Sequence, residues 1–412
     1  MTTSVLYISY TGLLDPLGQS QVLQYVLGLA KTHRMTVLTY EKPAALADTQ
    51  RVQALQSQCR AAGVDWHHLV WHNRPGIPAT LYDIAQGIRK ATRLARASGA
   101  QVVHCRSYIG GMIGLSVKRR TGARYIFDMR GFWPDERVDG GIWSRSGLPY
   151  RVFKQVERRL FLGADHVVSL TRAGVREFAA FDYLQGRLPP VSVIPTCTNL
   201  EMFRRIDSPR EGFTLGYVGS AGSWYMFDDV ARTVQRIFAR RPDARFLVIN
   251  KGGHQQIDAA LRRAGVDMAR VEIREALFTE VAAQIGRMDA GIFFVKPAWS
   301  KRASCPTRMG EFLACGKPCL ANAGVGDVEE DFGETSTGVT LPVDAEGGLV
   351  TTGIDAAIER LFDLAAAPDI GARCRAAAEA RFALEGGIAE YDAIYRKLAV
   401  PAGAAPAGAV AA

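Results

Sequence analysis

Apolar runs of strand length alternate with segments of helical periodicity along most of the chain. Residues 5–8 form the first run, and a helical stripe with apolar residues at positions 22, 26 and 29 follows it. Unbroken apolar runs bounded by turn residues are typical of parallel strands that are covered on both faces. The sequence therefore predicts an α/β protein built from doubly wound parallel sheets.

This alternation occurs in two series, separated by an interruption near residues 204–211. Strands are expected at 5–8, 36–40, 101–105, 124–127 and 166–170, then at 215–218, 245–249, 271–273, 292–295 and 319–321. Helices are expected at 81–97, 109–118, 150–162, 228–239, 255–264, 279–287, 372–382 and 386–398. A chain of 412 residues is also too long for one hydrophobic core. We therefore expect two domains, over 1–205 and 206–385, and a disordered tail over the Ala-, Gly- and Pro-rich residues 401–412.

The stretch 304–318 carries the strongest functional signal. It joins two expected strands, Pro306 suits a first helical turn, and Gly316 lies where that helix should stop. A helix that begins at the carboxyl end of a parallel strand offers free N–H groups to a phosphate, and Arg308 adds a positive charge there. Glu311 lies about one turn further on, on the same side of the helix. A cation for a diphosphate and a carboxylate for ribose hydroxyls predict a nucleotide-diphosphate site.

This motif and several other segments, in their order and spacing, resemble the family 4 glycosyltransferases. The other segments are SYTGLLDPLGQSQVL, YIFDMRGFWPDERVDGGIW, VIPTCTNLEMF, LGYVGSAGSWY and RFALEGGIAEYDAIY. The resemblance implies a GT-B fold, in which two doubly wound, Rossmann-like parallel-sheet domains face each other across a cleft. It implies a retaining glycosyltransferase that moves a hexosyl unit from a nucleotide-diphosphate sugar to an acceptor hydroxyl, without a further cofactor. Domain 1–205 would bind the acceptor, domain 206–385 the donor, and a helix at about 386–400 would cross back to the first domain.

The sequence departs from the family pattern at two places in the donor site. The family often has two glutamates eight positions apart; Glu311 matches the second, but Ala303 stands at the first. The family's arginine and lysine after the first strand of the second domain are replaced by the turn 219–225. Positive charge for the leaving diphosphate would then come from Arg308, Lys296 and backbone amides.

The resemblance assigns the donor residues as follows. Arg308 and Lys296 would stabilise the leaving diphosphate as catalytic residues, because that is where negative charge develops. Amides of Gly219 and Ser220 would lie near the distal phosphate. The remaining expected donor-binding positions are Thr307, Met309, Glu311, Asn322 and Gly324. No metal site is expected, because no Asp-x-Asp cluster follows a predicted strand.

Acceptor-side candidates follow strands of the first domain. Gly18 and Gln19 lie in a loop after the first strand that either faces the cleft or forms an ordinary turn. Asp128 ends a strand where most relatives have a histidine, and is expected to bind the sugar or to orient the acceptor hydroxyl. It could equally form a buried ion pair with Arg130 or Arg106. Arg106 itself is expected to line the cleft.

Residues 131–149 show neither strand nor helix periodicity, which suggests a long functional loop. The loop carries Trp133 and Asp135, and aromatic rings with carboxylates suit the recognition of sugars. We therefore expect this segment to help bind the acceptor.

Charge is distributed unevenly between the two domains. Residues 1–205 hold 27 Lys and Arg against 14 Asp and Glu, while the remainder holds 23 against 27. A basic first half suits a lipid-pyrophosphate acceptor or peripheral contact with an anionic membrane, although an arginine-rich surface without a partner explains it too. No nucleic-acid motif is present. Seven scattered cysteines and the lack of an apolar run of about 18 residues predict a cytoplasmic protein, with peripheral contact at the inner face of the membrane.

Two rival functions remain open at this point. A GT-B-fold epimerase or hydrolase of sugar nucleotides would share the nucleotide site. An inactive scaffold subunit of a polysaccharide assembly complex would explain the missing glutamate at Ala303. The favoured pathway for a transferase is the assembly of cell-envelope or exopolysaccharide glycans, with a glycan or lipid-linked acceptor.

Overall fold

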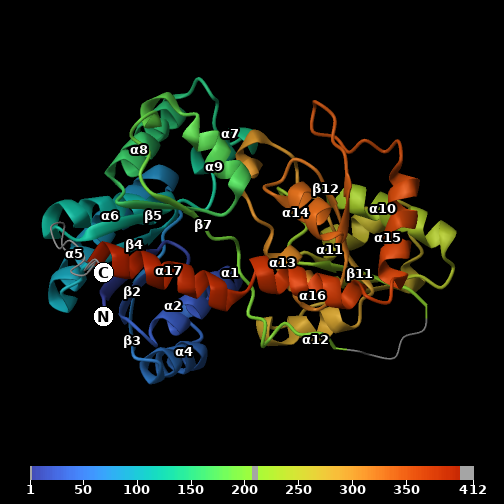
Figure 1. The fold of residues 1–412 in the computed structure, drawn as a ribbon, viewed down its shortest axis with the longest axis horizontal. Coiled ribbons are helices and arrows are strands. Elements are labelled where there is room, and N and C mark those ends of the chain that lie inside the picture. Colours follow the sequence, from blue (N-terminus) through green and yellow to red (C-terminus); the bar gives the residue numbers. More distant parts are fainter. Residues whose placement is uncertain (1, 207–211, 400–412) are drawn as a thin grey trace, which may run out of the picture.

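A computed structural model describes residues 2–206 and 212–399 and contains two parallel sheets. The expected boundary at 204–211 is thus described only up to residue 206, and the tail 401–412 lies outside the described residues. In Figure 1 the two sheets and their helices form two lobes, with the chain's first half on the left and its second half on the right.

All strands of the first sheet run parallel, in the order β3-β2-β1-β4-β5-β6-β7. Its strands are β1 (Ser4–Ser9), β2 (Arg34–Glu41), β3 (Val64–Val70), β4 (Val102–Arg106), β5 (Arg124–Asp128), β6 (His166–Ser169) and β7 (Val191–Val193). The order reverses direction at β1 and β4, as in doubly wound folds. Loops after β1 and β4 therefore meet at the carboxyl edge of the sheet.

The second sheet repeats this topology in the order β10-β9-β8-β11-β12-β13. Its strands are β8 (Thr214–Val218), β9 (Arg245–Ile249), β10 (Val271–Arg274), β11 (Ala290–Phe293), β12 (Cys319–Asn322) and β13 (Gly338–Leu341). Here the direction reverses at β8 and β11. The expected two doubly wound parallel sheets are confirmed.

Helices flank both sheets. In the first half they are α1 (Pro16–Gly18), α2 (Gln24–Leu29), α3 (Pro43–Leu46), α4 (Thr49–Ala61), α5 (Gly76–Ser98), α6 (Ser107–Thr121), α7 (Trp133–Asp139), α8 (Leu148–Gly163) and α9 (Arg172–Ala179). The second half contributes α10 (Phe227–Arg240), α11 (His254–Arg263), α12 (Val281–Gly286), α13 (Thr307–Ala314), α14 (Val328–Thr335), α15 (Ile354–Ala366), α16 (Ile370–Arg381) and α17 (Leu384–Ala399). None of the helices within the described ranges combines the length and apolar character that a membrane-crossing segment needs.

One expectation about the first half is wrong in part: residues 131–149 are not wholly irregular. Helix α7 occupies the first part of this segment, and α8 begins at Leu148. Pro134 stands near the start of α7, with Asp135 and Glu136 in its first turn, and all three favour a helix N-terminus. The helix is only seven residues long, too short to produce a recognisable period.

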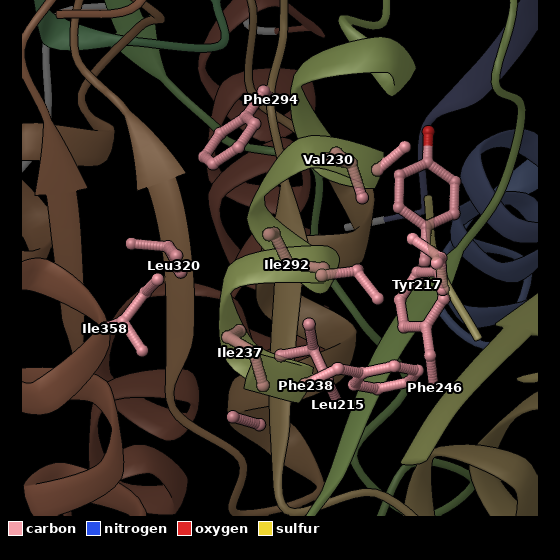
Figure 2. Packing of buried hydrophobic residues seen from close by; sticks show 14 of the residues in the cluster. Leu215, Tyr217, Val230, Ile237, Phe238, Phe246, Ile292, Phe294, Leu320 and Ile358 are labelled. Atoms are coloured by element: carbon pink, nitrogen blue, oxygen red, sulfur yellow. The ribbon is translucent and has the colours of Figure 1, made fainter. Parts of the chain in front are cut away.

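Apolar side chains fill the space between each sheet and its helices. Figure 2 shows part of the cluster beneath α10, where Leu215 and Tyr217 of β8 pack with Val230 and Ile237 of the helix. The phenol ring of Tyr217 belongs to this cluster, whereas its hydroxyl oxygen lies at the margin of the cluster, on the side away from Leu215. The core therefore fixes the ring of Tyr217 and leaves its polar end at the carboxyl edge of the sheet.

The carboxyl edges of the two sheets face each other, as contacts between their loops establish. Trp299, in a short helix after β11, donates from Nε1 to Glu177 of α9 at 2.7 Å, and its ring stacks on Phe132 at 4.4 Å. Thr171, just after β6, donates a 2.7 Å hydrogen bond to the carbonyl of Arg302. Loops that follow the strands of one sheet thus pack on loops that follow the strands of the other.

A buried carboxylate joins the halves a second time. Asp327, before α14, accepts the backbone N–H groups of Arg172 and Ala173 at 2.7 and 2.8 Å, at the start of α9. It also accepts a 2.6 Å hydrogen bond from Arg381. The side chain of Asp327 is 2% exposed, so these bonds are shielded from water. Asp327 therefore acts as an N-terminal anion for a helix of the opposite half.

The last helix returns to the first half. Helix α17 lies along α2 in Figure 1, while α16, which precedes it, lies on the other lobe. Tyr391 of α17 meets Tyr25 of α2 edge to face at 5.6 Å, and Ile388 packs on Gly28. A Cβ on Gly28 would come within 2.2 Å of Ile388 Cδ1, so glycine permits this close approach.

Candidate active site

Arg308 lies at the centre of the expected donor site. Its guanidinium carbon lies 4.9 Å from the ring centre of Tyr217 and 4.2 Å from that of Tyr225. The residue is 6% exposed, and its Nη1 is enclosed without a hydrogen-bond acceptor. Two aromatic faces therefore hold a buried cation, and one of its donors is left for a ligand.

Local structure explains this position. Helix α13 begins at Thr307, with Pro306 as its N-cap rather than in its first turn, so Arg308 is the second helical residue. Burial on its own would lower the pKa of Arg308, but the neighbouring tyrosines and Glu311 outweigh it and raise that pKa. The guanidinium thus stays positively charged at the end of a helix that already favours anions.

Glu311 lies one turn further along α13 and is 9% exposed. Burial raises the pKa of its carboxyl to about 7, although Arg308 acts in the opposite direction. No hydrogen bond from a described residue reaches this carboxylate. A buried acid without a donor, next to a guanidinium nitrogen (Nη1) without an acceptor, suits a ligand that carries hydroxyl groups beside negative charge.

The turn after β8 runs past Arg308, but it does not offer both of the expected amides. Gly219 has a φ of +106° and its N–H donates to the carbonyl of Ile249 at 2.8 Å, so that amide belongs to the sheet. Ser220 is exposed at the tip of the turn. Of the two expected phosphate-binding amides, only that of Ser220 remains open to a ligand among the described bonds.

Three other expected donor residues differ in how accessible they are to a ligand. Lys296 is exposed two residues after Phe294, and its backbone N–H donates to Trp224 at 2.8 Å. Thr307 is half-buried at the first position of α13. Met309 is 1% exposed, lies in an apolar cluster and donates its N–H to Pro306, which leaves it no polar group for a ligand.

The two expected positions after β12 serve to hold the backbone. The side chain of Asn322 accepts from the N–H of Val295 at 2.8 Å and donates to the carbonyls of Val295 and Ala323, each at 2.9 Å. Gly324 turns the chain with a φ of +79°. The Asn322 amide is therefore fully used in joining the end of β12 to the segment after β11.

The segment where the family has its first glutamate packs into the first half. Ala303 is fully buried, and a Cβ on Gly174 of α9 would come within 2.9 Å of its Cβ. Lys301 donates to Glu136 of α7 at 2.8 Å and lies 3.8 Å from the ring centre of Trp224. Residues 301–303 thus form part of the contact between the halves, and Lys301 does not join Arg308.

In the first half, the loop after β1 is tightly built. A Cβ on Gly18 would come within 1.8 Å of the carbonyl oxygen of Gly12, so only glycine fits there. Gln19 donates its side-chain amide to the carbonyl of Leu13. Glu41, at the end of β2, accepts a 2.7 Å hydrogen bond from the N–H of Leu13 and so holds the loop in place. Gly18 and Gln19 therefore shape this loop through internal contacts.

Asp128 and Arg106 are register partners at the carboxyl ends of β5 and β4. Asp128 is 1% exposed, and its Oδ2 lies 3.7 Å from Arg130, 3.6 Å from His104 and 3.2 Å from the hydroxyl of Tyr391. Burial would raise the pKa of Asp128, but Arg130 most strongly, then His104, hold that pKa below its ordinary value. Of the two ion pairs considered from the sequence, the structure contains the one with Arg130.

Trp133 and Asp135 both contribute to packing within the first half. The ring of Trp133 lies 4.9 Å from that of Phe153 and 5.3 Å from that of Trp143. Asp135 is 2% exposed and accepts from Tyr150 at 2.8 Å. It also accepts from Lys154 at 3.0 Å. The side chain of Asp135 is therefore committed to α8, and Trp133 to an aromatic cluster.

The structure thus brings Arg308, Glu311 and the turn at Gly219 together, and separately Asp128 with Arg106. Sequence reasoning missed the two tyrosines that hold Arg308 and the carboxylate of Glu41. Tyr217 could have been noted as the penultimate residue of a predicted strand, whereas no local pattern links Tyr225 to Arg308. Among the described residues, no cluster of three or more His, Cys, Asp or Glu side chains could hold a metal ion.

Residues 18–197 match the sequence profile of the family described as "Glycosyl transferase 4-like domain". No functionally curated protein matches the sequence. Among solved structures, a sucrose-phosphate synthase from Thermosynechococcus elongatus is 15% identical with a TM-score of 0.71, over 96% of this chain and 99% of that one. A glycosyltransferase from Rickettsia africae is 14% identical with a TM-score of 0.69, over 97% and 100% of the two chains. Anabaena HepE in complex with UDP and glucose is 13% identical with a TM-score of 0.65, over 96% and 100%. These neighbours share the GT-B arrangement of two parallel sheets.

Proposed function

We propose that this chain, a glycosyltransferase of the GT-B fold whose residues 18–197 are a glycosyl transferase 4-like domain, moves a hexosyl unit from a nucleotide-diphosphate sugar to an acceptor hydroxyl with retention of configuration. The observation that carries the proposal is the buried guanidinium of Arg308, which has a free donor and lies beside the unpaired carboxylate of Glu311. A diphosphate would accept from the first, and ribose hydroxyls would donate to the second.

The proposed chemistry needs positive charge more than a strong base. When the glycosidic bond to the donor breaks, negative charge builds on the leaving diphosphate, where Arg308 and the start of α13 stabilise it. Lys296, exposed near the same turn, would add long-range attraction. The leaving phosphate oxygen then takes the proton of the acceptor hydroxyl. At the same time the acceptor oxygen bonds to the anomeric carbon, on the face from which the diphosphate leaves. No carboxylate of the chain is required to become covalently attached.

The identity of the donor can be tested by direct binding. HepE from Anabaena has been solved with UDP and with UDP-glucose, so uridine nucleotides are the first to try. Calorimetric titration with UDP, GDP and ADP, and with their glucose derivatives, should find one nucleotide that binds the wild-type protein. Arg308→Gln should weaken that binding at least about tenfold, since a hydrogen-bonded charge is lost. Arg263→Gln, an exposed arginine of α11, is the matched control. Failure of every nucleotide to bind would refute the donor site.

Other assays distinguish the transferase from the two rival functions, a sugar-nucleotide epimerase or hydrolase and an inactive scaffold subunit. A sugar-nucleotide epimerase or hydrolase acts on the donor alone, whereas a transferase without acceptor shows at most slow hydrolysis. Incubation with the bound donor, followed by chromatography of the sugar, distinguishes them. A scaffold subunit need not bind nucleotide at all, so the titration addresses it directly.

For the cellular setting, we propose glycan assembly at an anionic membrane surface, in the pathway of cell-envelope or exopolysaccharide synthesis. The supporting observation is the outer face of α8, where Leu148, Val152 and Leu162 are 73%, 48% and 37% exposed. Arginines at positions 151, 158 and 159 are exposed on the same helix. Apolar side chains between cations fit an interface of acidic lipid head groups.

A further inference from the structure

Arg106 is a buried cation without a partner. It is 7% exposed, and its guanidinium makes no hydrogen bond or ion pair with any residue in the described ranges 2–206 and 212–399. Its Nε is fully enclosed, and so is Nε of the neighbouring Arg130. Buried charges in proteins are normally paired, so this arrangement lacks an anion.

The local charges do not balance without such an anion. Asp128 is the carboxylate of this group, and it lies 3.7 Å from Arg130 but not within 4 Å of Arg106. Burial lowers the pKa of His104, so that side chain is neutral near pH 7. Burial, and after it the charge of Arg130, also lowers the pKa of Arg106, which nevertheless stays protonated. Two guanidinium groups thus share one carboxylate.

The backbone of Arg106 also begins a helix, although its side chain points to the other face of the sheet. Arg106 is the N-cap of α6, a helix of 15 residues, and no side chain caps its first N–H groups. Gly110, in the first turn, lies with its α-carbon against the carbonyl of Ile8, where a Cβ would come within 3.1 Å. The groups that act on the Arg106 guanidinium include Tyr7 and Tyr391, which belong to the cluster under α17 rather than to the cluster under α6. An oxyanion that pairs with Arg106 would therefore bind on the α17 face of the sheet.

Asp128 needs a hydrogen-bond donor from the ligand, whereas the arginines need an anion. Its Oδ1 is enclosed and has no donor, so it can accept a hydrogen bond from a ligand. A ligand that satisfies the whole group must therefore carry an oxyanion and a hydroxyl close together. Phosphorylated sugars combine both.

We propose that Arg106 and Arg130 form a second phosphate site, and that the acceptor of the transfer reaction carries the phosphate that occupies it. Asp128 would then hold a hydroxyl of the same acceptor. The identification of the ligand as the acceptor rests on the proposed function, whereas the phosphate site itself does not. The site lies in the first half, apart from Arg308 in the second half.

The test uses inorganic phosphate as the probe in an Arg308→Gln background, so that the donor site does not contribute. Equilibrium dialysis with labelled phosphate should find one saturable site in this variant. Adding Arg106→Gln should weaken binding at least about tenfold, because a charge-assisted pair is lost. Adding Arg34→Gln instead, at the opposite edge of the same sheet, should leave binding unchanged. No saturable binding, or equal affinity in both double variants, would overturn the proposal.

A second variant and a competition experiment complete the test. If Arg106→Gln does not melt cooperatively, Arg106→Lys keeps the charge without the planar fork and should bind phosphate several-fold more weakly; unchanged affinity contradicts the assignment. Competition then identifies the source of the phosphate. Displacement by a hexose 1-phosphate indicates a soluble acceptor, and displacement by farnesyl diphosphate a lipid-linked one. If neither displaces the phosphate, the site does not bind an acceptor. Because donor titration of the wild-type protein is a separate measurement, either proposal can fail alone.

Discussion

The guanidinium of Arg308 occupies the space that a side chain at Gly219 would need. A Cβ built on Gly219 would come within 2.6 Å of Arg308 Nη2 and 3.2 Å of Cζ. Gly219 comes from the turn after β8, and Arg308 from the second residue of α13. The turn that lacks the expected basic residues thus leaves room for a cation supplied by a different element.

Gly219→Ala should therefore disturb the donor site through Arg308. Alanine at a φ of +106° is strained by about 1–3 kcal/mol, and Arg308 must also move away from the new methyl group. We expect lower unfolding free energy in urea and weaker nucleotide binding. Gly333→Ala in α14, where a Cβ meets nothing within 4 Å, should instead be neutral or slightly stabilising. Equal nucleotide affinity in Gly219→Ala and wild type would contradict this account.

Arg308→Ala tests the role of the cation in the chemical step. Loss of one donor aimed at developing charge lowers turnover by about 10²–10³-fold in other enzymes, and we expect a similar loss in kcat here. The Michaelis constant for the acceptor should change little if, as we propose, the acceptor is bound by the first half. Steady-state kinetics with both substrates measure this difference. Small and equal changes in kcat and in the acceptor constant would argue against a role at the leaving group.

Glu311→Gln should stabilise the fold at high pH while it weakens donor binding. The carboxyl has a pKa of about 7 in the folded protein, raised by burial above the ordinary value of 4.5, so the native state holds its proton more tightly. Stability from this group is complete below about pH 4.5 and is lost as the pH rises through about 7. Relative to wild type, the variant should gain roughly 3 kcal/mol of unfolding free energy at pH 8 and almost none at pH 4.

Urea denaturation at the two pH values measures that difference. Nucleotide titration of the same variant should show at least about tenfold weaker binding, since the amide replaces the carboxylate that we propose as the acceptor for ribose hydroxyls. If the variant differs from wild type by the same unfolding free energy at pH 4 and pH 8, folding does not raise the pKa of the Glu311 carboxyl.

Asp327→Asn tests the contact between the halves. The buried carboxylate accepts from two backbone N–H groups of α9 and from Arg381, and removing its charge leaves that arginine with its 2.8 Å pair to Asp331 alone. We expect a loss of about 3 kcal/mol in unfolding free energy. Glu330→Gln is the control, because its pair with Arg176 is largely exposed and contributes less than about 1 kcal/mol. Similar losses in both variants would contradict a special role of Asp327.

Contact with an acidic membrane predicts a further difference. Wild-type protein should sediment with vesicles that contain phosphatidylglycerol and not with pure phosphatidylcholine. Combined Leu148→Ser and Val152→Ser changes on the outer face of α8 should reduce that binding. Leu277→Ser, equally exposed in the second half, should have no effect. Unchanged sedimentation of the α8 variant would place any membrane contact elsewhere.

Local patterns were enough to predict most of the sheets. The strand expected at 245–249 is β9, and the strand, helix and strand around the nucleotide motif appear as β11, α13 and β12. Those segments have continuous apolar runs and clear turn signals at their ends. Strands β3, β7 and β13 were missed, since they are edge or near-edge strands with half-buried or exposed residues. Their position in the sheet, rather than their own sequence, stabilises them.

The candidate site was predictable in composition but not in geometry. The sequence placed Arg308 and Glu311 on one helix, near its start, and the structure has them there. It could not reveal that Gly219 uses its amide in the sheet or that Asn322 is saturated by backbone groups, because both depend on neighbouring strands. Nor could it find the pairing of Tyr217 and Tyr225 around the guanidinium, since these residues are brought to Arg308 only by tertiary folding.

The return of α17 to the first half affects the order in which the protein can be completed. Tyr391 and Tyr395 of this helix supply the hydroxyls that contact Asp128 and His104, yet they are made after all strands of the second sheet. During synthesis, Asp128 and His104 therefore remain without these hydroxyl partners until residues 384–399 have left the ribosome. Any chimera that exchanges this lobe between relatives would have to transfer residues 384–399 with it.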